Sequence, residues 1–355
     1  MDQDIPFYKV SDMNIVGNEK EMVSQNNTIS ENIRKLIGSS IIAKGSTIFP
    51  KIGGAIATNK KRLISRDCCV DNNVMGVIPY KEKIDSDFLF YFFLSHDLSD
   101  FANEAHLPSI KKTVVENCKI AIPLERGEQQ RIVAMLDEAF AAIATTEANA
   151  EKNLNNVRVL FDSYLNAVFS QRGDGWVERT VDELSLNLDS KRIPITKSDR
   201  KSGKYPYYGA SGIVDYVADY IFDGDTLLVS EDGANLLARS TPIAFSVSGK
   251  YWVNNHAHIL KFEDMATQRF VEYYFGSIKV DEYITGAAQP KLNQKALNSI
   301  PIFIPKSVEE QANIVDSIEL LSTETQRLEV IYQKKLVALD ALKKSILHQA
   351  FTGKL

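Results

Sequence analysis

The sequence predicts an α+β fold with an internal repeat, in which a globular part followed by a long helix occurs twice. The first observation is that residues 122–133 and 304–315 share six identical residues at a shift of 182 positions. The second is that residues 125–170 and 307–352 contain no proline, as expected of long helices. The third is the length of 355 residues, which suits two domains at roughly 100 to 200 residues per domain.

The globular parts are expected at residues 1–122 and 173–304, followed by helices at 123–172 and 305–355. Short apolar runs bounded by glycine, proline and asparagine predict strands at 39–43, 226–230, 243–247 and 300–304. One aromatic-rich helix is expected in each part, at 87–95 and 268–276, with its rings in the core. Both parts should therefore contain more strand than helix.

The two long helices carry apolar residues at alternating spacings of four and three, the pattern of a coiled coil. A helix of about 43 residues spans roughly 65 Å. Because an exposed apolar stripe of that length would be insoluble, we expect the helices to pack as an antiparallel pair, with the globular parts at opposite ends. Both seams turn small or polar midway, at Ala150 and Asn153 in the first helix and at Lys335 in the second. The apolar members of the predicted interface are Ile132, Leu136, Ile143, Val157 and Leu160, and Ile314, Ile318, Leu321, Leu328, Leu339, Leu342 and Ile346.

Motifs of several enzyme classes are absent from the sequence. It contains no GxxxxGK[ST] phosphate loop, no FxGxG-type cofactor loop and no NPPY-like tetrapeptide for base methylation. Three cysteines without CxxC spacing predict neither a disulfide framework nor a zinc site. The apolar runs are shorter than the ~18 residues of a membrane helix, and the N-terminus lacks a signal-peptide pattern, so we expect a cytoplasmic protein.

Two groups of side chains leave a metal site as an alternative. His256 and His258 lie on one face of an expected strand, but no third ligand is near in sequence, so a structural pair is favoured. Four acids could serve a metal-dependent nuclease, although no lysine follows at Glu-x-Lys spacing and roles in turns and caps are favoured; they are Asp223, Asp225, Glu231 and Asp232. We therefore expect no metal site and no catalytic residues.

Charge is segregated along the chain. The net charge is −5, yet residues 41–66 hold six basic residues and no acid, and residues 191–204 hold six basic residues and one acid. One basic segment in each repeat predicts nucleic-acid binding. The candidate DNA-contact residues are Lys51, Lys60, Lys61, Arg62 and Arg66 in the first repeat, and Lys191, Arg192, Arg200, Lys201 and Lys204 in the second. Residues 125–151 are rich in acids, which suits a protein partner instead.

The segment from Gly286 to Gln311 carries a resemblance to a known family. It contains Gln289, Leu292-Asn293, Leu297, Ile300, Ile302 and Ile304-Pro305, and it leads into Glu310-Gln311. This resembles the GA-x-Q-x-x-LN-x-x-x-L-x-x-I-x-I-P-x-P-x-x-EQ pattern of the specificity (S, HsdS) subunits of type I restriction–modification systems. Residues 107–130 hold a weaker version, and the resemblance covers nearly the whole chain.

The resemblance implies a DNA-recognition subunit without catalytic activity of its own. Each globular part would be a target-recognition domain that reads one half of a split double-stranded DNA site. The helices would set the spacing and dock two methyltransferase (M) subunits, and endonuclease (R) subunits would join through the complex. S-adenosylmethionine, ATP and magnesium are expected on those partners, and no cofactor on this chain. Lys111, Lys112, Gln289 and Lys291 complete the candidate DNA-binding residues, with Gln289 suited to pair with adenine.

The first repeat departs from the second at its start. Ile5-Pro6-Phe7-Tyr8 resembles Tyr205-Pro206-Tyr207-Tyr208, but about 30 residues of the second repeat, 173–204, precede the latter. We therefore expect the first domain to be incomplete at its N-terminus, through truncation or replacement. The alternative function is a coiled-coil adaptor that binds only proteins. Salt dependence separates the two, because phosphate contacts make affinity fall steeply with salt.

Overall fold

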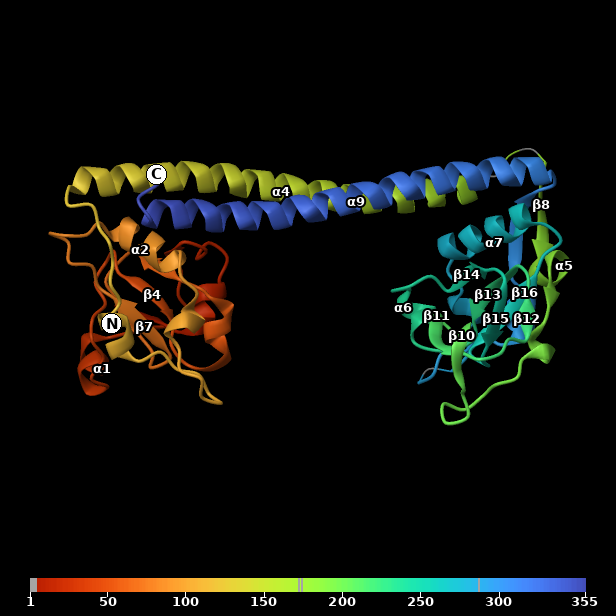
Figure 1. Ribbon diagram of the computed structural model, residues 1–355, viewed down its shortest axis with the longest axis horizontal. Helices are drawn as coiled ribbons and strands as arrows, with labels where there is room; N and C mark the ends of the chain where they lie inside the picture. The colour runs from red at the N-terminus through yellow and green to blue at the C-terminus, as the bar shows by residue number, and fades with distance from the viewer. Residues whose placement is uncertain (1–4, 172, 174, 287) are drawn as a thin grey trace. The chain divides into compact units, whose positions relative to one another are not determined.

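The computed structural model describes residues 5–171, 173, 175–286 and 288–355, so Ala287 of the segment from Gly286 to Gln311 and the first four residues lie outside it. The chain divides into two compact units (Figure 1). Unit 1 comprises residues 1–151 and 333–355, and unit 2 comprises residues 152–332. Each long helix contributes one half to each unit. No helix among the described residues is long and apolar enough to cross a membrane.

Unit 1 is built on two small sheets and several short helices. The sheets have the strand orders β3-β1-β6 and β2-β5-β4-β7. In chain order the elements are β1 (Ile5–Tyr8), η1 (Val10–Asn14), β2 (Glu21–Met22), β3 (Thr28–Ile29), α1 (Glu31–Leu36), β4 (Thr47–Pro50), η2 (Gly53–Thr58), β5 (Arg62–Ile64), β6 (Cys69–Val70), β7 (Val74–Val77), α2 (Ser86–Leu94), η3 (Leu98–Phe101) and α3 (Lys112–Glu116).

Helix α2 lies between the sheet of β4 and β5 and the long helices. Asp85 caps it by accepting hydrogen bonds from the backbone N–H groups of Asp87 and Phe88. Its six buried residues, 88–93, belong to a core that also contains Ile132 and Leu136 of the first long helix and Leu347 of the second. The aromatic run expected to lie in the core is therefore where the globular part of unit 1 meets the helix pair.

Unit 2 contains two four-stranded sheets, β11-β10-β15-β12 and β14-β13-β16-β9, and the pair β17-β8. Its elements are β8 (Trp176–Thr180), α5 (Val181–Leu184), β9 (Leu186–Asn187), η4 (Asp189–Lys191), β10 (Ser202–Gly209), β11 (Gly212–Val217), β12 (Phe222–Asp223), β13 (Thr226–Ser230), α6 (Asn235–Ala238), β14 (Ala244–Val247), β15 (Lys250–Val253), β16 (Ala257–Lys261), α7 (Met265–Ser277), η5 (Asp281–Tyr283), α8 (Gln294–Asn298) and β17 (Pro301–Pro305).

The core of unit 2 lies between the sheet of β13 and β16 and the long helices. All five residues of β13 are buried, which explains the apolar run at 227–229 between Thr226 and Ser230. Helix α7, capped by Asp264, contributes Phe270 and Phe275 to a core that also contains Phe169 and Ile318 of the long helices. The units thus bury their aromatic helices in the same way, each against the portions of the two long helices that it contains.

Strand pairing confirms the repeat. In unit 1, Tyr8 of β1 pairs in parallel with Val70 of β6. In unit 2, Tyr208 of β10, which the sequence comparison matched to Tyr8, pairs in parallel with Val253 of β15. The strand expected at 39–43 is wrong, because only an isolated bridge between Ile42 and Cys68 occurs there. The α+β class and the repeat of the fold are confirmed.

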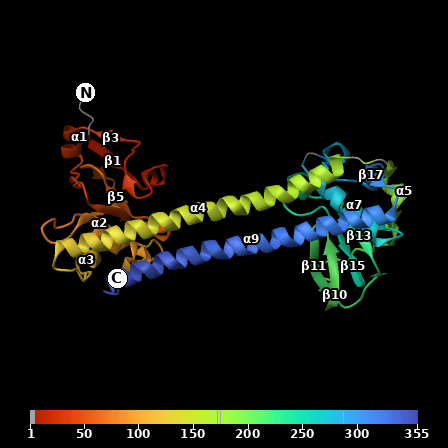
Figure 2. The same cartoon turned by 90° about the horizontal axis from the view of Figure 1, so that it is seen from above.

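The long helices are α4 (Arg126–Ser170) and α9 (Val308–Phe351). Within each unit they lie side by side and antiparallel (Figure 2). In unit 1 the Nζ of Lys343 lies 2.6 Å from a carboxylate oxygen of Glu147, and in unit 2 the Nε of Arg158 lies 3.3 Å from one of Glu329. From the first pair to the second, the residue number rises along α4, from 147 to 158, and falls along α9, from 343 to 329, as in an antiparallel pair.

The helix interface follows the predicted seam only in part. Ile132, Leu136, Ile143, Val157 and Ile318 are buried, and Ile314, Leu321, Leu328, Leu339 and Ile346 are partly buried. Leu160 and Leu342 were predicted wrongly, because their side chains are 52% and 45% exposed. Leu154, Phe161 and Leu336 are partly buried in place of Asn153, Leu160 and Lys335.

The inward-facing positions shift by one residue because, in both helices, a spacing of four residues occurs where the heptad pattern has a spacing of three. The inward positions of α4 run Thr146, Ala150 and Leu154, and those of α9 run Leu328, Tyr332 and Leu336, so two steps of four follow each other. A straight helix has 3.6 residues per turn and drifts by about 20° per heptad against a strict 3.5-residue repeat. A second step of four returns the apolar face to the partner helix, which a strict heptad count could not predict.

Candidate nucleic-acid interface

The basic segment 191–204 of unit 2 divides into exposed lysines and internally bound arginines. Lys191, Lys201 and Lys204 are exposed. The Arg200 guanidinium lies 4.4 Å from the ring centre of Tyr207, and its Nη1 lies 3.3 Å from a carboxylate oxygen of Asp215. Arg200 therefore holds the loop against the hairpin of β10 and β11, whereas the three lysines are free of the ion pairs found among the described residues.

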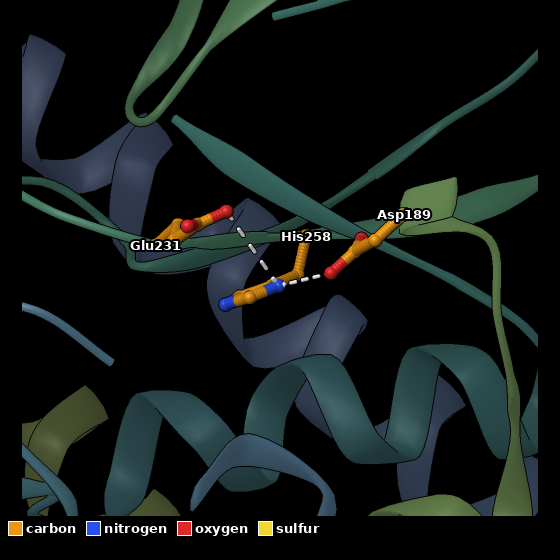
Figure 3. A group of neighbouring side chains, drawn as sticks. All are labelled: Asp189, Glu231 and His258. Atoms are coloured by element: carbon orange, nitrogen blue, oxygen red, sulfur yellow. Dashed lines mark hydrogen bonds and ion pairs between the residues drawn. The ribbon is translucent and has the colours of Figure 1, made fainter. Parts of the chain in front are cut away.

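Arg192 belongs to a buried ion-pair network with Asp189, Glu231 and His258, of which Figure 3 shows the last three. Its Nη1 donates to Glu231 Oε2 at 2.6 Å and to the carbonyl of Ala257 at 2.9 Å. Its Nη2 lies 3.5 Å from Asp189 Oδ2. The Arg192 side chain is only 15% exposed, so it stabilises the base of the basic loop and is not placed to contact a phosphate. For Arg192 the prediction of DNA contact was wrong.

His258 ties this network to the strand on which it lies and to the turn before α8. Its Nδ1 is 2.5 Å from Asp189 Oδ2, and its Nε2 is 2.7 Å from the carbonyl oxygen of Leu292. Since a carbonyl only accepts, Nε2 donates to Leu292, and Nδ1 faces the carboxylate of Asp189. Burial raises the pKa of Asp189, but hydrogen bonds from His258 and Ile259 and the charge of Arg192 outweigh it and lower that pKa. The arrangement therefore holds the imidazole ring of His258 between two oxygen atoms.

The same side chains have ligand types that a metal could use, since atoms of Asp189, Glu231 and His258 lie within 4.8 Å of one another. However, the 2.5 Å contact between Nδ1 and Oδ2 is hydrogen-bond distance. Two ligands that each lie about 2.0 Å from a metal would be farther apart. The carboxylate of Glu231 already forms an ion pair with Arg192. We interpret the group as an ion-pair network. His256 instead pairs with Asp232 at 2.9 Å on the surface.

The candidate base-reading turn is bound to this network. The Nζ of Lys291 lies 3.1 Å from Glu231 Oε1, so Lys291 and Arg192 share one carboxylate. Burial raises the pKa of Glu231, but hydrogen bonds from Arg192 and Lys291 outweigh it and lower that pKa. The backbones of Lys291 and Thr285 exchange two hydrogen bonds, which fixes the turn, while Gln289 is exposed. The structure thus joins the loop at 191–204 and the turn at 289–291 through Glu231.

The basic segment of unit 1 is largely occupied by internal contacts. Lys61 is 1% exposed, and its Nζ donates to Asn59 Oδ1 at 2.5 Å and to the carbonyl of His96 at 2.7 Å. Burial lowers the pKa of Lys61 to about 8. The prediction that Lys61 contacts DNA was therefore wrong, because the amine is enclosed between two loops and meets no solvent. Arg62 is also bound internally, to the carbonyls of Lys61 and Met13.

The remaining basic candidates of unit 1 lie at or near the surface. Arg66 and Lys111 are exposed, Lys51 is partly buried, and Lys60 donates to Asn14. Lys112 pairs with Glu116 at 3.3 Å within α3. Arg66 and Lys111 therefore stay the clearest candidates for phosphate contact in unit 1.

Sequence reasoning missed the groups that organise unit 2. Asp189 was not considered, and Glu231 and His258 were considered as metal ligands, with structural roles favoured, but not as partners of Arg192 and Lys291. Their one available signal was charge balance, because arginines and lysines that are buried require nearby carboxylates. A second cluster also escaped notice: Tyr205 and Tyr220 have ring centres 5.0 Å apart, and the Nζ of Lys250 lies 4.4 Å from the ring centre of Tyr220.

A repeated α+β unit with exposed basic residues in each copy, joined to antiparallel helices, is the architecture of a modular nucleic-acid-binding protein. The sequence matches the model of the type I restriction modification DNA specificity domain over residues 1–156 and 173–334. These ranges cover most of the chain and both copies of the repeat. The chain therefore belongs to that family.

Two curated relatives are similar to the chain. A putative type I restriction enzyme specificity subunit, S.HindORF215P of Haemophilus influenzae, is 32% identical over 185 residues, which are 47% of this chain and 48% of that protein. The match thus spans about half of that relative. The EcoprrI specificity subunit of Escherichia coli is 22% identical over 362 residues, which are 94% of this chain and 84% of that protein.

Solved structures share the fold. One chain, from a study of complex assembly and conformational transition in the type I R-M system, has a TM-score of 0.78 at 16% identity. The match covers 99% of this chain and 92% of that chain. The HsdS subunit of Thermoanaerobacter tengcongensis has a TM-score of 0.65 at 17% identity. The match covers 99% of this chain and 91% of that subunit. At such low identity these likenesses establish the fold alone.

Proposed function

We propose that this chain is the DNA-specificity subunit of a type I restriction–modification complex, in which each globular part binds one half of a two-part site on double-stranded DNA. The observation that carries the proposal is that the family match covers both copies of the repeat. Exposed basic residues in each copy support it, namely Arg66 and Lys111 in unit 1 and Lys191, Lys201 and Lys204 in unit 2.

The long helices serve as spacer and as docking surface for two methyltransferase subunits, and endonuclease subunits join through the complex. Large apolar side chains on the outer faces of the helices support docking: Leu320 is 68% exposed and Val337 is 65% exposed. S-adenosylmethionine, ATP and magnesium are bound by the partners. This chain selects the DNA and catalyses no step itself, and the complex acts in the cytoplasm.

The proposal is tested by purifying the chain with its methyltransferase subunits and measuring DNA binding and methylation. Binding to a DNA library should weaken steeply as salt rises, and the methylated sites should share one motif with two fixed halves and an unread gap. An assembly that forms but neither binds nor methylates DNA would support the protein-only adaptor instead.

The first expected result concerns Lys201 and Lys204, which are exposed at the start of β10. Replacing both by Ala should weaken binding to all DNA sequences and lower the slope of log affinity against log salt by about 2, since each lost phosphate contact lowers it by about 1. The matched control is Lys279→Ala with Lys306→Ala, which removes the same charge elsewhere in unit 2. Equal effects of the two double variants would remove residues 201–204 from the interface.

The second expected result concerns base reading by Gln289. Its exposed amide can pair with the N6 and N7 atoms of adenine. Gln289→Ala should relax one position of one half-site, at a discrimination cost of about 1 to 3 kcal/mol, with little change in non-specific affinity. Methylation mapping measures this, with the exposed Gln294→Ala as control. An unchanged motif would assign the turn a purely structural role.

A further inference from the structure

Each long helix is tied to its globular part by one buried glutamine in its first turn. Gln129 of α4 is not exposed, and Gln311 of α9 is 5% exposed. The Nε2 of Gln129 donates to the carbonyl of Pro123 at 2.9 Å, and the Nε2 of Gln311 donates to the carbonyl of Pro305 at 2.7 Å. In both units the side-chain amide therefore closes the turn that leads into the helix.

The other end of each amide reaches the aromatic helix of the globular part. Gln129 Oε1 accepts from the backbone N–H of Asp85 at 2.8 Å, and Asp85 caps α2. Gln311 Oε1 accepts from the hydroxyl of Thr267 at 2.7 Å, and Thr267 lies in the first turn of α7. All of these partners are equivalent at the shift of 182 positions, because 85 and 267, 123 and 305, and 129 and 311 correspond.

The neighbouring position does not share this behaviour. Glu128 pairs with Arg131 at 2.7 Å on the surface of α4, whereas Glu310 accepts from the indole N–H of Trp176 at 3.2 Å. The two units thus differ at the preceding glutamate but repeat two of the glutamine contacts, although one donor is a backbone amide and the other a hydroxyl; Gln129 also donates to the carbonyl of Lys83 at 3.0 Å. An arrangement reached through different donors indicates that the geometry itself matters.

Apolar contacts around these glutamines already bury the helix starts, since Ile132 and Val315 lie in the two cores. Such contacts are not directional. Hydrogen bonds to a buried amide are directional, and leaving one partner unsatisfied is costly. The glutamine therefore adds what the apolar core cannot, a fixed rotation of the globular part about the start of its long helix.

We infer that Gln129 and Gln311 are positioning residues that hold each globular part in one orientation on its helix, and that they thereby make the gap between the two half-sites strict. This inference rests on the proposed function, in which each part reads one half-site. The half-sites themselves are read by other residues, so the glutamines should govern the gap and not the motif.

The experiment compares methylation maps made with the complete chain and its methyltransferase subunits. The variants are Gln311→Met, which keeps the volume but removes both hydrogen bonds, and Thr267→Val, which removes the donor to Oε1 together with the 3.0 Å contact of the hydroxyl with Asp264 Oδ2. The exposed Glu309→Gln, in the same helical turn, is the control. We expect both variants to keep the half-sites but to raise methylation at sites with a gap one base pair longer or shorter. The rise should be about tenfold over the wild type for Thr267→Val, the scale set by one hydrogen bond of roughly 1.4 kcal/mol, and larger for Gln311→Met.

Thermal unfolding of each variant separates positioning from stability. A lowered melting temperature with a gap as strict as in the wild type overturns the inference and leaves the glutamines a structural role. If Gln311→Met does not fold, Thr267→Val decides, because it keeps the bond to the Pro305 carbonyl. If the wild-type complex methylates no two-part motif, the proposed function fails and the inference fails with it. If the wild type methylates such a motif and the variants keep the gap strict, only the inference fails.

Discussion

Replacing Glu231 by Gln should lower the free energy of unfolding of unit 2 by about 3 to 5 kcal/mol, the cost of breaking a buried ion pair. Glu231 is the carboxylate that Arg192 and Lys291 share. The side chains of Glu231 and Arg192 are only 12% and 15% exposed, so solvent screens their interaction weakly. Without the carboxylate charge, Lys291 loses its ion pair, and Asp189 is left as the carboxylate that faces Arg192 and His258.

The loss should be local as well as large. Hydrogen exchange is expected to speed up in the loop at 191–201 and in the turn at 289–291, because both are bound to Glu231, and DNA affinity should fall with it. Glu263→Gln, an exposed carboxylate of the same unit, is the control and should change the free energy of unfolding by less than about 0.5 kcal/mol. If the two variants melted alike, Glu231 would have no organising role.

The second large effect is expected from lengthening the helix pair. Duplicating residues 146–149 in α4 and 340–343 in α9 adds four residues to each helix at the place where Glu147 meets Lys343. Four residues add about 6 Å of rise. Because DNA rises about 3.4 Å per base pair, the unread gap should lengthen by one or two base pairs while both half-sites stay the same. Methylation mapping of the lengthened protein measures this.

The design uses a spacing that the helices already contain. In both helices, three successive inward-facing positions are separated by four residues each. A further insertion of four residues therefore repeats a spacing that the helices already tolerate. Duplication in α4 alone is the control, since it puts the helices out of register and should lower stability without giving one longer gap. An unchanged gap in the doubly lengthened protein would contradict the role of the helices as a spacer and would favour placement by the partner subunits.

The repeat, the long helices and the basic segments were readable from sequence because each is a local pattern. The match of Tyr8 to Tyr208 predicted equivalent residues, and each of the two lies in a parallel strand pair of its own unit, Tyr8 opposite Val70 and Tyr208 opposite Val253. The aromatic helices were also predicted within a few residues, as α2 and α7. Apolar periodicity reports on burial, and burial against a long helix is what these segments share.

The role of each charged side chain was not readable in this way. Lys61 and Lys201 look alike in a count of basic residues, yet one is buried between Asn59 and His96 and the other is exposed. Arg192 and Lys291 lie far apart in the chain, and only folding brings them to the same carboxylate. A charge count records which residues are present but not which carboxylate or carbonyl each one meets.

The sequence by itself determined the α+β class, the two copies of the unit, the antiparallel helices and the family, because these depend on periodicity and on short motifs. Only the tertiary structure decided which basic residues are free for DNA, and which helix positions face inward beyond Ala150. Both depend on three-dimensional neighbours. Leu160 and Leu342 fit a strict heptad, but a helix of 3.6 residues per turn carries them to the exposed face.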